Sequence, residues 1–168
     1  MFARTSRLTL RPPWPEDAPA IAAAIAHEAV VMKLGSVPWP YTEAHAAEFL
    51  ARPASPRDLF LAVLAHDAGA VRLIGGVGLH PAGEERELGY WLTPDAWGRG
   101  YATEAARAMV AIARYALGLR RIVSAYFLDN PASGHVLAKL GFRVTGQARR
   151  PCLARGHEVS SALMTLEW

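Results

Sequence analysis

Residues 87–105 read Glu87-Leu-Gly-Tyr-Trp-Leu-Thr-Pro-Asp-Ala-Trp-Gly-Arg-Gly-Tyr-Ala-Thr-Glu-Ala105. This pattern predicts a strand, a short loop that contains Gly98 and Gly100, and the first turns of a long helix. The two glycines allow the backbone to approach a ligand closely and to adopt positive φ values. The helix that follows presents unpaired N–H groups and the positive end of its dipole to the same loop. We therefore expect a cradle for a pyrophosphate that is built from backbone groups, and hence a cofactor.

The size and composition of the chain indicate one globular domain. The 168 residues are 52% hydrophobic and 20% charged, without a low-complexity block or an internal repeat. A chain of this length and hydrophobicity can bury a substantial core, which excludes a disordered protein. We expect a single domain over residues 1–168.

The charges do not favour a nucleic-acid partner. The net charge is only +3, and the arginines are scattered along the sequence instead of being concentrated in one segment. The exception is the group Arg149, Arg150 and Arg155. We interpret this group first as a solvated loop and second as a site for an acidic partner or a ligand phosphate.

The N-terminus and the cysteine content favour a cytoplasmic protein without a membrane partner. Cys152 is the only cysteine, so no intrachain disulfide can form, and this fits a reducing compartment. The N-terminus lacks the apolar core of a signal peptide. The longest alanine-rich run, residues 18–31, is too short to cross a bilayer.

Hydrophobic periodicity and turn residues predict the order βααβββαβαββ. Strands are expected at residues 8–11, 59–65, 73–80, 86–92, 121–127, 142–146 and 160–166. Helices are expected at residues 16–30, 42–51, 101–117 and 130–141, with Gly118 just after the third helix and Asn130 as the N-cap of the fourth. We expect an α/β (α+β) fold with a mixed, mostly antiparallel sheet of about six to seven strands and about four flanking helices.

Three segments in this order resemble the GNAT superfamily of acetyl-CoA-dependent N-acetyltransferases. They are Arg4-Thr-Ser-Arg-Leu-Thr-Leu-Arg11 with Glu16-Asp17, then Leu88-Gly-Tyr-Trp-Leu with Trp97-Gly-Arg-Gly-Tyr-Ala-Thr-Glu-Ala105, and finally Asn130-Pro-Ala-Ser133 with Lys139-Leu-Gly-Phe142. The likeness is greatest to the Rim-type branch, which acetylates the N-terminal amines of ribosomal proteins. The three segments together span nearly the whole chain.

The resemblance implies where the cosubstrate acetyl-CoA binds. The family's pyrophosphate loop falls on Trp97, Gly100 and Ala102, with Trp97 in place of the usual Gln or Arg. In the family the cosubstrate lies between two strands that separate, here residues 90–92 and 123–127. The implied cofactor-binding residues are Trp91, Leu92, Trp97, Gly98, Arg99, Gly100, Tyr101, Ala102, Thr103, Asn130 and Ser133.

Acetyl transfer requires the acceptor amine to be neutral. For a lysine-type amine at neutral pH this costs about 4–5 kcal/mol, whereas an α-amine lies only about one pKa unit above neutrality. Glu87 begins the strand before the loop and is the candidate base, directly or through water. The alternative is that Glu87 is a solvated acid like Glu84 and Glu85 before it. Glu104 is interpreted as an acid that complements the helix dipole.

Ser133 is the candidate proton donor to the leaving thiolate. Many members of the superfamily have a tyrosine later in the same helix, where this chain has Leu137. The alternative for Ser133 is a role in starting the helix, and Asn130 can be both N-cap and cofactor ligand.

Trp39 and Tyr41 lie where this branch contacts the acceptor, and the alternative is that these aromatic side chains anchor their loop in the core. Histidine as a residue type can change its charge near neutral pH, which makes His80 and His157 candidates, but a lone histidine is more often structural. No two histidines have the spacing of metal ligands, so we expect no metal.

Two other functions stay open. In a dinucleotide-binding oxidoreductase, Gly98 and Gly100 would belong to a Rossmann unit, but Thr103 replaces the third small residue of that fingerprint. A non-catalytic acetyl-CoA binder would act as a sensor or scaffold. We expect transfer of an acetyl group from acetyl-CoA to a primary amine by direct attack in a ternary complex. Candidate acceptors are a protein N-terminus, a polyamine, an amino acid and an aminoglycoside, and a homodimer through residues 162–166 also stays open.

Overall fold

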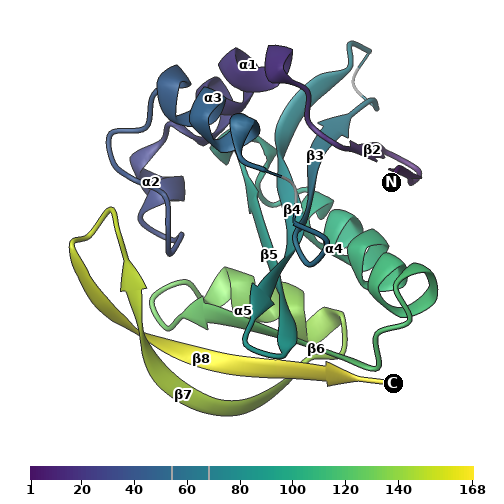
Figure 1. Cartoon of the computed structure of the whole chain (residues 1–168), viewed down its shortest axis with the longest axis vertical. Coiled ribbons are helices and arrows are strands. Elements are labelled where there is room, and N and C mark those ends of the chain that lie inside the picture. The colour runs from purple at the N-terminus through teal and green to yellow at the C-terminus, as the bar shows by residue number, and fades with distance from the viewer. Residues whose placement is uncertain (54, 68) are drawn as a thin grey trace.

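One twisted sheet runs through the described chain, which comprises residues 1–53, 55–67 and 69–168 (Figure 1). In this computed structural model the described residues form eight strands in the order β1-β2-β3-β4-β5-β6-β8-β7. All neighbouring strands are antiparallel except β5 and β6, which are parallel. The strands are β1 (Ala3–Arg4), β2 (Leu8–Arg11), β3 (Leu59–Ala65), β4 (Arg72–Ala82), β5 (Glu85–Leu92), β6 (Arg121–Phe127), β7 (Arg143–Cys152) and β8 (His157–Glu167). The predicted fold class and mixed, mostly antiparallel sheet are confirmed.

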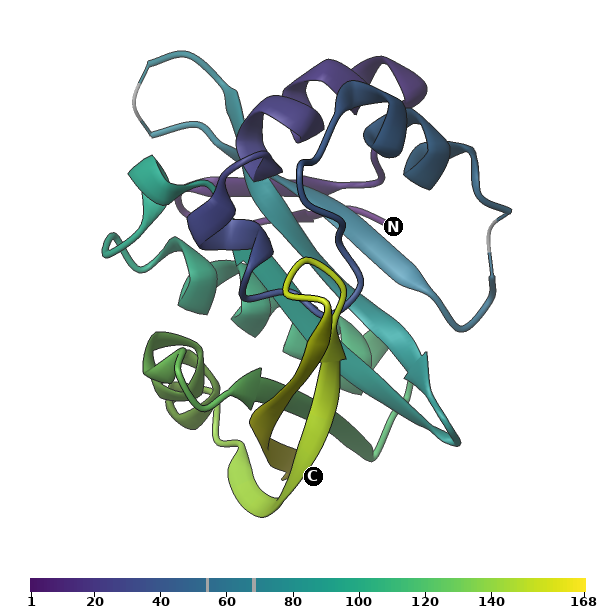
Figure 2. The same cartoon turned by 90° about the vertical axis from the view of Figure 1, so that its left-hand side faces the viewer.

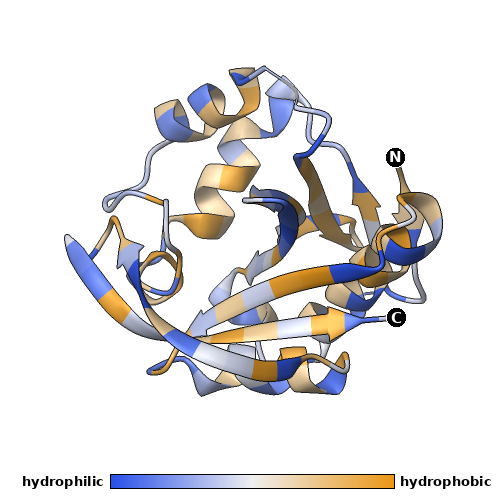
Figure 3. Ribbon diagram, turned by 60° about the horizontal axis from the view of Figure 1, so that its bottom comes forward, coloured by the Kyte–Doolittle hydropathy of each residue, from blue (hydrophilic) through white to orange (hydrophobic). Residues whose placement is uncertain are grey.

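Helices cover both faces of this sheet (Figures 1 and 2). The described residues contain five α-helices, α1 (Ala18–Ile25), α2 (Glu28–Val31), α3 (Glu43–Ala51), α4 (Tyr101–Ala111) and α5 (Pro131–Lys139). The helices α4 and α5 pack on one face, and α1 and α3 pack together on the other. Several helices carry bands of hydrophobic and hydrophilic residues, as expected of helices that lie between a core and solvent (Figure 3). None of the described helices is long and apolar enough to cross a membrane.

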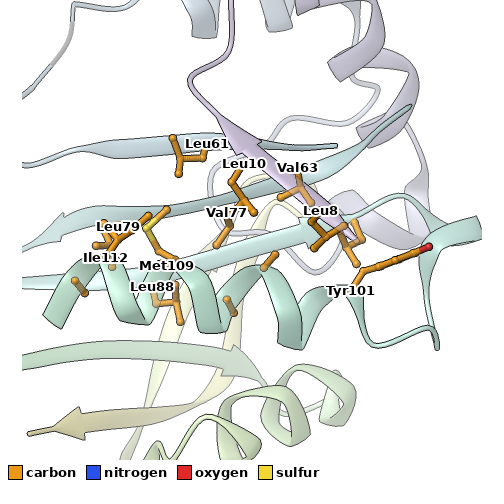
Figure 4. Close-up of a cluster of buried hydrophobic side chains, with 14 of the residues drawn as sticks. Leu8, Leu10, Leu61, Val63, Val77, Leu79, Leu88, Tyr101, Met109 and Ile112 are labelled. Carbon is orange, nitrogen blue, oxygen red and sulfur yellow. The ribbon is translucent and has the colours of Figure 1, made fainter. Parts of the chain in front are cut away.

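The main core lies between the sheet and α4 (Figure 4). Its buried side chains come from alternate positions of four neighbouring strands and from one stripe of the helix. They include Leu8, Leu10, Leu61, Val63, Val77, Leu79, Leu88, Tyr101, Met109 and Ile112. Full burial of one such aliphatic side chain contributes roughly 1.5–3 kcal/mol. The core therefore fixes the N-terminus of α4, and the loop before it, relative to the strands.

The prediction of one helix over residues 16–30 is wrong. A 3-10 helix covers Pro15–Asp17, α1 ends at Ile25, and α2 begins only at Glu28. His27 interrupts the helix because its backbone is extended, with φ −125° and ψ 126°. The carbonyl oxygen of His27 then accepts hydrogen bonds from the N–H groups of Val30 and Val31, which starts α2.

The ends of the sheet also differ from the prediction. The strand β1 is an additional short strand, and β7 and β8 extend well beyond residues 142–146 and 160–166. Most residues of β7 are exposed, so its sequence lacks the alternation by which a half-buried strand is recognised. The third predicted helix does reach residue 116, because a π-helical turn over Ile112–Ala116 follows α4. Leu117 is the C-cap of this turn, and Gly118 follows it with a φ of 63°.

Candidate active site

A cleft opens where the two parallel strands separate. The strands β5 and β6 pair at Glu87 and Val123, and Ser124 Oγ donates a hydrogen bond of 2.8 Å to the carbonyl oxygen of Leu88 beside that pair. Past this point the described residues of the two strands form no further pair. The resulting cleft of about 1030 Å³ is lined by Tyr90, Trp91 and Leu92 on one side and by Ala125, Tyr126 and Phe127 on the other. This is the separation expected at residues 90–92 and 123–127.

The glycine loop forms one end of the cleft. Gly98 and Gly100 have φ values of 72° and 81°, which only glycine adopts without strain. A Cβ atom added to Gly98 would meet no atom within 4 Å, so this part of the backbone faces open space. Trp97, Gly98, Gly100, Tyr101, Ala102 and Thr103 all line the cleft.

The start of α4 fits an anionic ligand. The first hydrogen bond of the helix joins the N–H of Glu104 to the carbonyl oxygen of Gly100, so the N–H groups of Tyr101, Ala102 and Thr103 precede the helical ladder. Backbone donors of this kind, together with the helix dipole, bind phosphate groups. The pyrophosphate of acetyl-CoA therefore fits these residues. The side chain of Tyr101 is not available to a ligand, because it is buried and its hydroxyl donates to Asp67.

Hydrogen bonds from side chains hold the glycine loop in place. Trp97 Nε1 donates a hydrogen bond of 2.9 Å to the carbonyl oxygen of Leu92, and Arg7 Nη1 donates one of 2.9 Å to the carbonyl oxygen of Arg99. Glu104 accepts hydrogen bonds from Thr5 Oγ1 and from the backbone N–H and Nε of Arg7. Glu104 thus does more than complement the helix dipole, since it ties the N-terminal segment to α4.

Ser133 of α5 also lines the cleft and is hydrogen-bonded to Tyr90 of β5. The Tyr90 hydroxyl donates to the carbonyl oxygen of Ser133 at 2.9 Å and lies 2.9 Å from Ser133 Oγ. Since the phenolic hydrogen points to the carbonyl, the Ser133 hydroxyl can donate to the Tyr90 oxygen. Burial raises the pKa of Tyr90 to about 12, so this phenol is neutral at physiological pH.

Asn130 occupies the N-cap position of α5, as predicted, but it does not cap the helix with its side chain. Its side chain forms no capping hydrogen bond, while its own N–H donates to the carbonyl oxygen of Phe127 at 2.7 Å. Asn130 lines the cleft together with Ser133. Its amide is thus placed for a ligand of the cleft.

Glu87 forms an ion pair at the point where the strands part. Arg150 of β7 donates from Nη1 and Nη2 to the two carboxylate oxygens of Glu87, at 2.8 Å and 2.9 Å. The side chains are 35% and 26% exposed for Arg150 and Glu87, respectively. Glu87 is therefore not a freely solvated acid, and its negative charge is balanced at close range.

The predicted solvated arginine loop is wrong in part, because Arg149 and Arg150 lie in β7, and of the three arginines only Arg149 is largely solvated. Arg155 binds the carboxylate of Asp129, and its Nε donates 2.8 Å to the carbonyl oxygen of Met32. The hydrogen bond from Arg155 holds the pKa of Asp129 below its ordinary value. Arg149, in contrast, is 63% exposed and pairs with Glu158. The tip of the β7–β8 hairpin thus lies against the segment that follows α2, as both views show (Figures 1 and 2).

The second face of the sheet contributes the other part of the cleft. Here Gly76, Gly78 and Gly89 occupy neighbouring positions of β4 and β5 and form a glycine floor. The rings of Phe60 and His80 lie in the space that side chains at Gly76 and Gly78 would fill. Tyr41 lines this part of the cleft, half-buried, and its ring centroid lies 5.4 Å from that of His45. Burial raises the pKa of Tyr41. Trp39 is 39% exposed and is not among the residues that line the cleft.

Two of these site features were missed by the sequence interpretation. Tyr90 was seen only as part of a cleft-lining strand, although a tyrosine hydroxyl was the group missing at position 137. Arg150 was interpreted as part of a solvated loop, and its pairing with Glu87 was not predicted. Within the described residues no group of three or more His, Cys, Asp or Glu side chains is arranged to hold a metal ion.

A parallel strand pair that parts beside a glycine loop and a helix N-terminus is the arrangement that the resemblance to acetyl-CoA-dependent acetyltransferases implied. The family model for the acetyltransferase (GNAT) domain matches residues 7–143. The chain therefore belongs to the GNAT family of N-acetyltransferases and transfers an acetyl group from acetyl-CoA.

One curated relative is similar in sequence, and solved structures share the fold. The chain is 32% identical over 152 residues to "Uncharacterized N-acetyltransferase YoaA" of Bacillus subtilis (strain 168), which covers 87% of this chain and 85% of that protein. The ribosomal-protein-S5-alanine acetyltransferase from Vibrio fischeri has the same fold, with a TM-score of 0.83 at 20% identity over 99% of this chain and 96% of that one. The microcin C7 self-immunity acetyltransferase MccE, solved with acetyl-CoA and AMP, has a TM-score of 0.82 at 17% identity, over 98% of this chain and 94% of that one.

Proposed function

We propose that the acceptor is a primary amine and that it attacks acetyl-CoA directly in a ternary complex. We favour the N-terminal α-amine of a peptide over a small-molecule amine. Direct attack requires the thioester and the acceptor to meet in one cavity. The cleft provides this, since it extends from the glycine loop to the glycine floor on the second face of the sheet. A protein N-terminus is also the easier substrate, because an α-amine requires about one pKa unit of deprotonation at neutral pH.

The charges in the cleft support an acceptor with a single amine. The described charged residues that line it are Lys33, Arg52, Lys139 and Arg150 on the cationic side and Glu48 and Glu87 on the anionic side. Four positive and two negative groups favour the phosphates of acetyl-CoA but repel a polycation. Spermidine should therefore be a poorer acceptor than a peptide with one free α-amine.

Residues at the two ends of the cleft would have different roles in the reaction. Backbone N–H groups at Gly98 to Thr103 would hold the pyrophosphate, and Asn130 would bind near the thiol end. Acetyl-CoA supplies an activated acetyl group on a thiol leaving group. Ser133 would donate a proton to the departing sulfur, with Tyr90 holding the serine hydroxyl in place. Glu87 would act on the acceptor side, as the base or as the anion that attracts the acceptor's ammonium group.

One observation carries this proposal, namely the Ser133–Tyr90 pair in the wall of a cleft whose other end is a phosphate cradle. Calorimetric titration with acetyl-CoA, with NADH as the control, tests the cradle. Saturable binding of acetyl-CoA alone is expected. An absence of acetyl-CoA binding by folded protein would contradict the proposal, and binding of NADH instead would favour a dinucleotide-binding domain.

Thiol release with a panel of amines then tests the acceptor. The panel is a peptide that begins with alanine, a peptide that begins with serine, a free amino acid, an aminoglycoside and spermidine. A peptide should give the highest kcat/KM. If spermidine were best, the proposed acceptor class would be wrong.

A non-catalytic acetyl-CoA binder is the second candidate, and a double variant separates it from an enzyme. E87Q combined with S133A should abolish most turnover and leave acetyl-CoA binding intact. If the double variant retained full turnover, the assignment of Glu87 and Ser133 would be wrong. If no panel amine released thiol while acetyl-CoA bound, the sensor reading would be favoured.

A further inference from the structure

A second pair of titratable side chains lies at the acceptor end of the cleft. His80 of β4 lines the cleft, and its Nδ1 lies 2.8 Å from Oδ1 of Asp58, which immediately precedes β3. The two side chains are 43% and 45% exposed, so both are within reach of an incoming molecule. The proposed roles of Glu87 and Ser133 do not use this pair.

The His80 ring lies across the glycine floor. A Cβ atom added to Gly78 would come within 3.0 Å of Nε2 of His80, and one added to Gly89 within 3.6 Å of the same atom. The imidazole therefore fits here because neither position carries a side chain. His80 and Glu87 are also direct partners in the β4–β5 ladder and thus project from the same face of the sheet.

The partner of each side chain decides which atom can accept a proton. An ionised carboxylate only accepts hydrogen bonds, so Asp58 takes the hydrogen of Nδ1, and Nε2 of the neutral ring keeps its lone pair. Both oxygens of Glu87 already accept hydrogen bonds from Arg150. Protonation of Glu87 would weaken its ion pair with Arg150, whereas none of the described residues forms a hydrogen bond with Nε2 of His80.

We propose that His80 is the general base of the reaction, oriented by Asp58, and that Glu87 attracts and positions the acceptor. This inference rests on the proposed acetyl transfer to an amine. The acceptor's ammonium group gives one proton to Nε2 of His80. The freed nitrogen lone pair forms the N–C bond to the acetyl carbon as the C–S bond breaks. Ser133 gives its proton to the sulfur and, in net terms, regains one from the acceptor nitrogen. His80 then returns its proton to water.

The test compares four variants with the wild type on the alanine-initiated peptide, with acetyl-CoA saturating. H80Q should lower kcat/KM at neutral pH by about 10²-fold, the low end of the usual contribution of a general base. D58N should lower it less, since the imidazole remains. H157Q is the matched control because His157 is exposed and lies outside the cleft, and it should have no effect. E87Q should raise KM for the peptide more than it lowers kcat.

The pH profile distinguishes a base from a merely structural histidine. The charged groups that face His80 are Asp58 from the β3 side and Glu87 from β5, with Arg150 paired to Glu87. The defect of H80Q should shrink at alkaline pH, where the amine is neutral in solution, and that of D58N should shrink likewise. A defect of H80Q that is constant with pH would overturn the inference. Imidazole ¹⁵N resonances provide a readout without turnover, and they should show hydrogen on Nδ1 of His80 in the wild type and a mixed tautomer in D58N.

The outcomes separate this inference from the proposed function. If the wild type acetylates the peptide and H80Q does so equally well, His80 is not the base and the proposed function still stands. If E87Q shows the pH-dependent defect and H80Q does not, Glu87 is the base. If the wild type binds no acetyl-CoA or acetylates no amine, the proposed function fails, and this inference fails with it. Acetyl-CoA affinity and thermal unfolding of each variant confirm that it is folded.

Discussion

Arg150 and Glu87 are 63 positions apart in the sequence, and both guanidinium Nη atoms of Arg150 bind the carboxylate of Glu87. The two residues lie on β7 and β5, which are separated in the sheet by β6 and β8. The pair thus joins the β7–β8 hairpin to the strand that begins the cleft. It fixes the orientation of the Glu87 carboxylate beside the point where β5 and β6 separate.

We expect R150Q to reduce acetyl transfer more than it reduces stability. Loss of the guanidinium leaves Glu87 without its orienting partner, so kcat/KM for a peptide acceptor should fall on the order of tenfold, equivalent to about 1.4 kcal/mol. The free energy of unfolding should change by no more than about 1 kcal/mol, since the pair is partly exposed. R149Q is the matched control, because Arg149 is the neighbouring residue and its partner Glu158 is solvated. Equal kinetic effects of the two variants would contradict a specific role for the pair.

Gly98 and Gly118 allow the cradle to be tested separately from backbone strain. Both have positive φ values, 72° and 63°, and at both an added Cβ atom would meet no atom within 4 Å. G98A and G118A should each cost about 1–2 kcal/mol of stability from the left-handed backbone alone. G98A should additionally raise the Kd for acetyl-CoA at least about tenfold, since its methyl group would occupy the space that faces the phosphates. Urea unfolding and calorimetry measure the two effects, and equal Kd values for the two variants would remove Gly98 from the cradle.

Tyr90 provides a prediction for both rate and pH. Y90F removes the hydrogen bonds to Ser133, so kcat should fall while the Kd for acetyl-CoA changes little, and stability should fall by about 1 kcal/mol. Burial raises the pKa of Tyr90 from 10.0 to about 12 in the folded protein. A raised pKa stabilises the fold below the unfolded-state value, and this stabilisation is lost as the pH rises through the folded-state value. The wild type should therefore lose stability relative to Y90F between about pH 10 and pH 12.

If denaturant unfolding gave parallel pH profiles for the wild type and Y90F, the phenol would not be buried as described. Y115F is the control for this experiment. Tyr115 is 76% exposed, and its loss should leave the pH profile unchanged.

Glu104 gives the opposite pH dependence. Its burial raises the pKa of the carboxyl, but hydrogen bonds from Thr5 and Arg7 and the charge of Arg7 outweigh burial, so the pKa lies below its ordinary value of 4.5. A lowered pKa stabilises the fold above the unfolded-state value, and this stabilisation is lost as the pH falls through the folded-state value. The wild type should be more stable than E104Q at neutral pH, and this difference should disappear on acidification below about pH 4.5.

E104Q should also weaken acetyl-CoA binding, because Arg7 braces the loop through the carbonyl oxygen of Arg99. Thermal unfolding over a pH series and calorimetry measure these two effects. E16Q is the control, since Glu16 is exposed and lies in the 3-10 helix before α1. A stability difference between the wild type and E104Q that persisted in acid would show that Glu104 acts through packing alone.

The sequence by itself determined most of the local elements, including the glycine loop before α4. The strands at residues 59–65 and 121–127 begin and end where they were predicted, because short apolar runs between turn residues encode them locally. The strand before the glycine loop ends at Leu92 and the helix after it begins at Tyr101, as predicted, since glycine φ values and helix termini depend on neighbouring residues only. The strand begins one residue earlier than predicted, at Glu85. Where a local signal was absent, as in the exposed β7 and at His27, the prediction failed.

Only the tertiary structure decided which side chains meet in the cleft. Ser133 meets Tyr90 from 43 positions away, Arg150 meets Glu87 from 63, and His80 meets Asp58 from 22. These pairs depend on the order of the strands in the sheet and on their register, which are set by packing of the whole core and not by any local pattern. The sequence contained every one of these residues, but among several arginines, acids and histidines only the folded backbone selects the pairs.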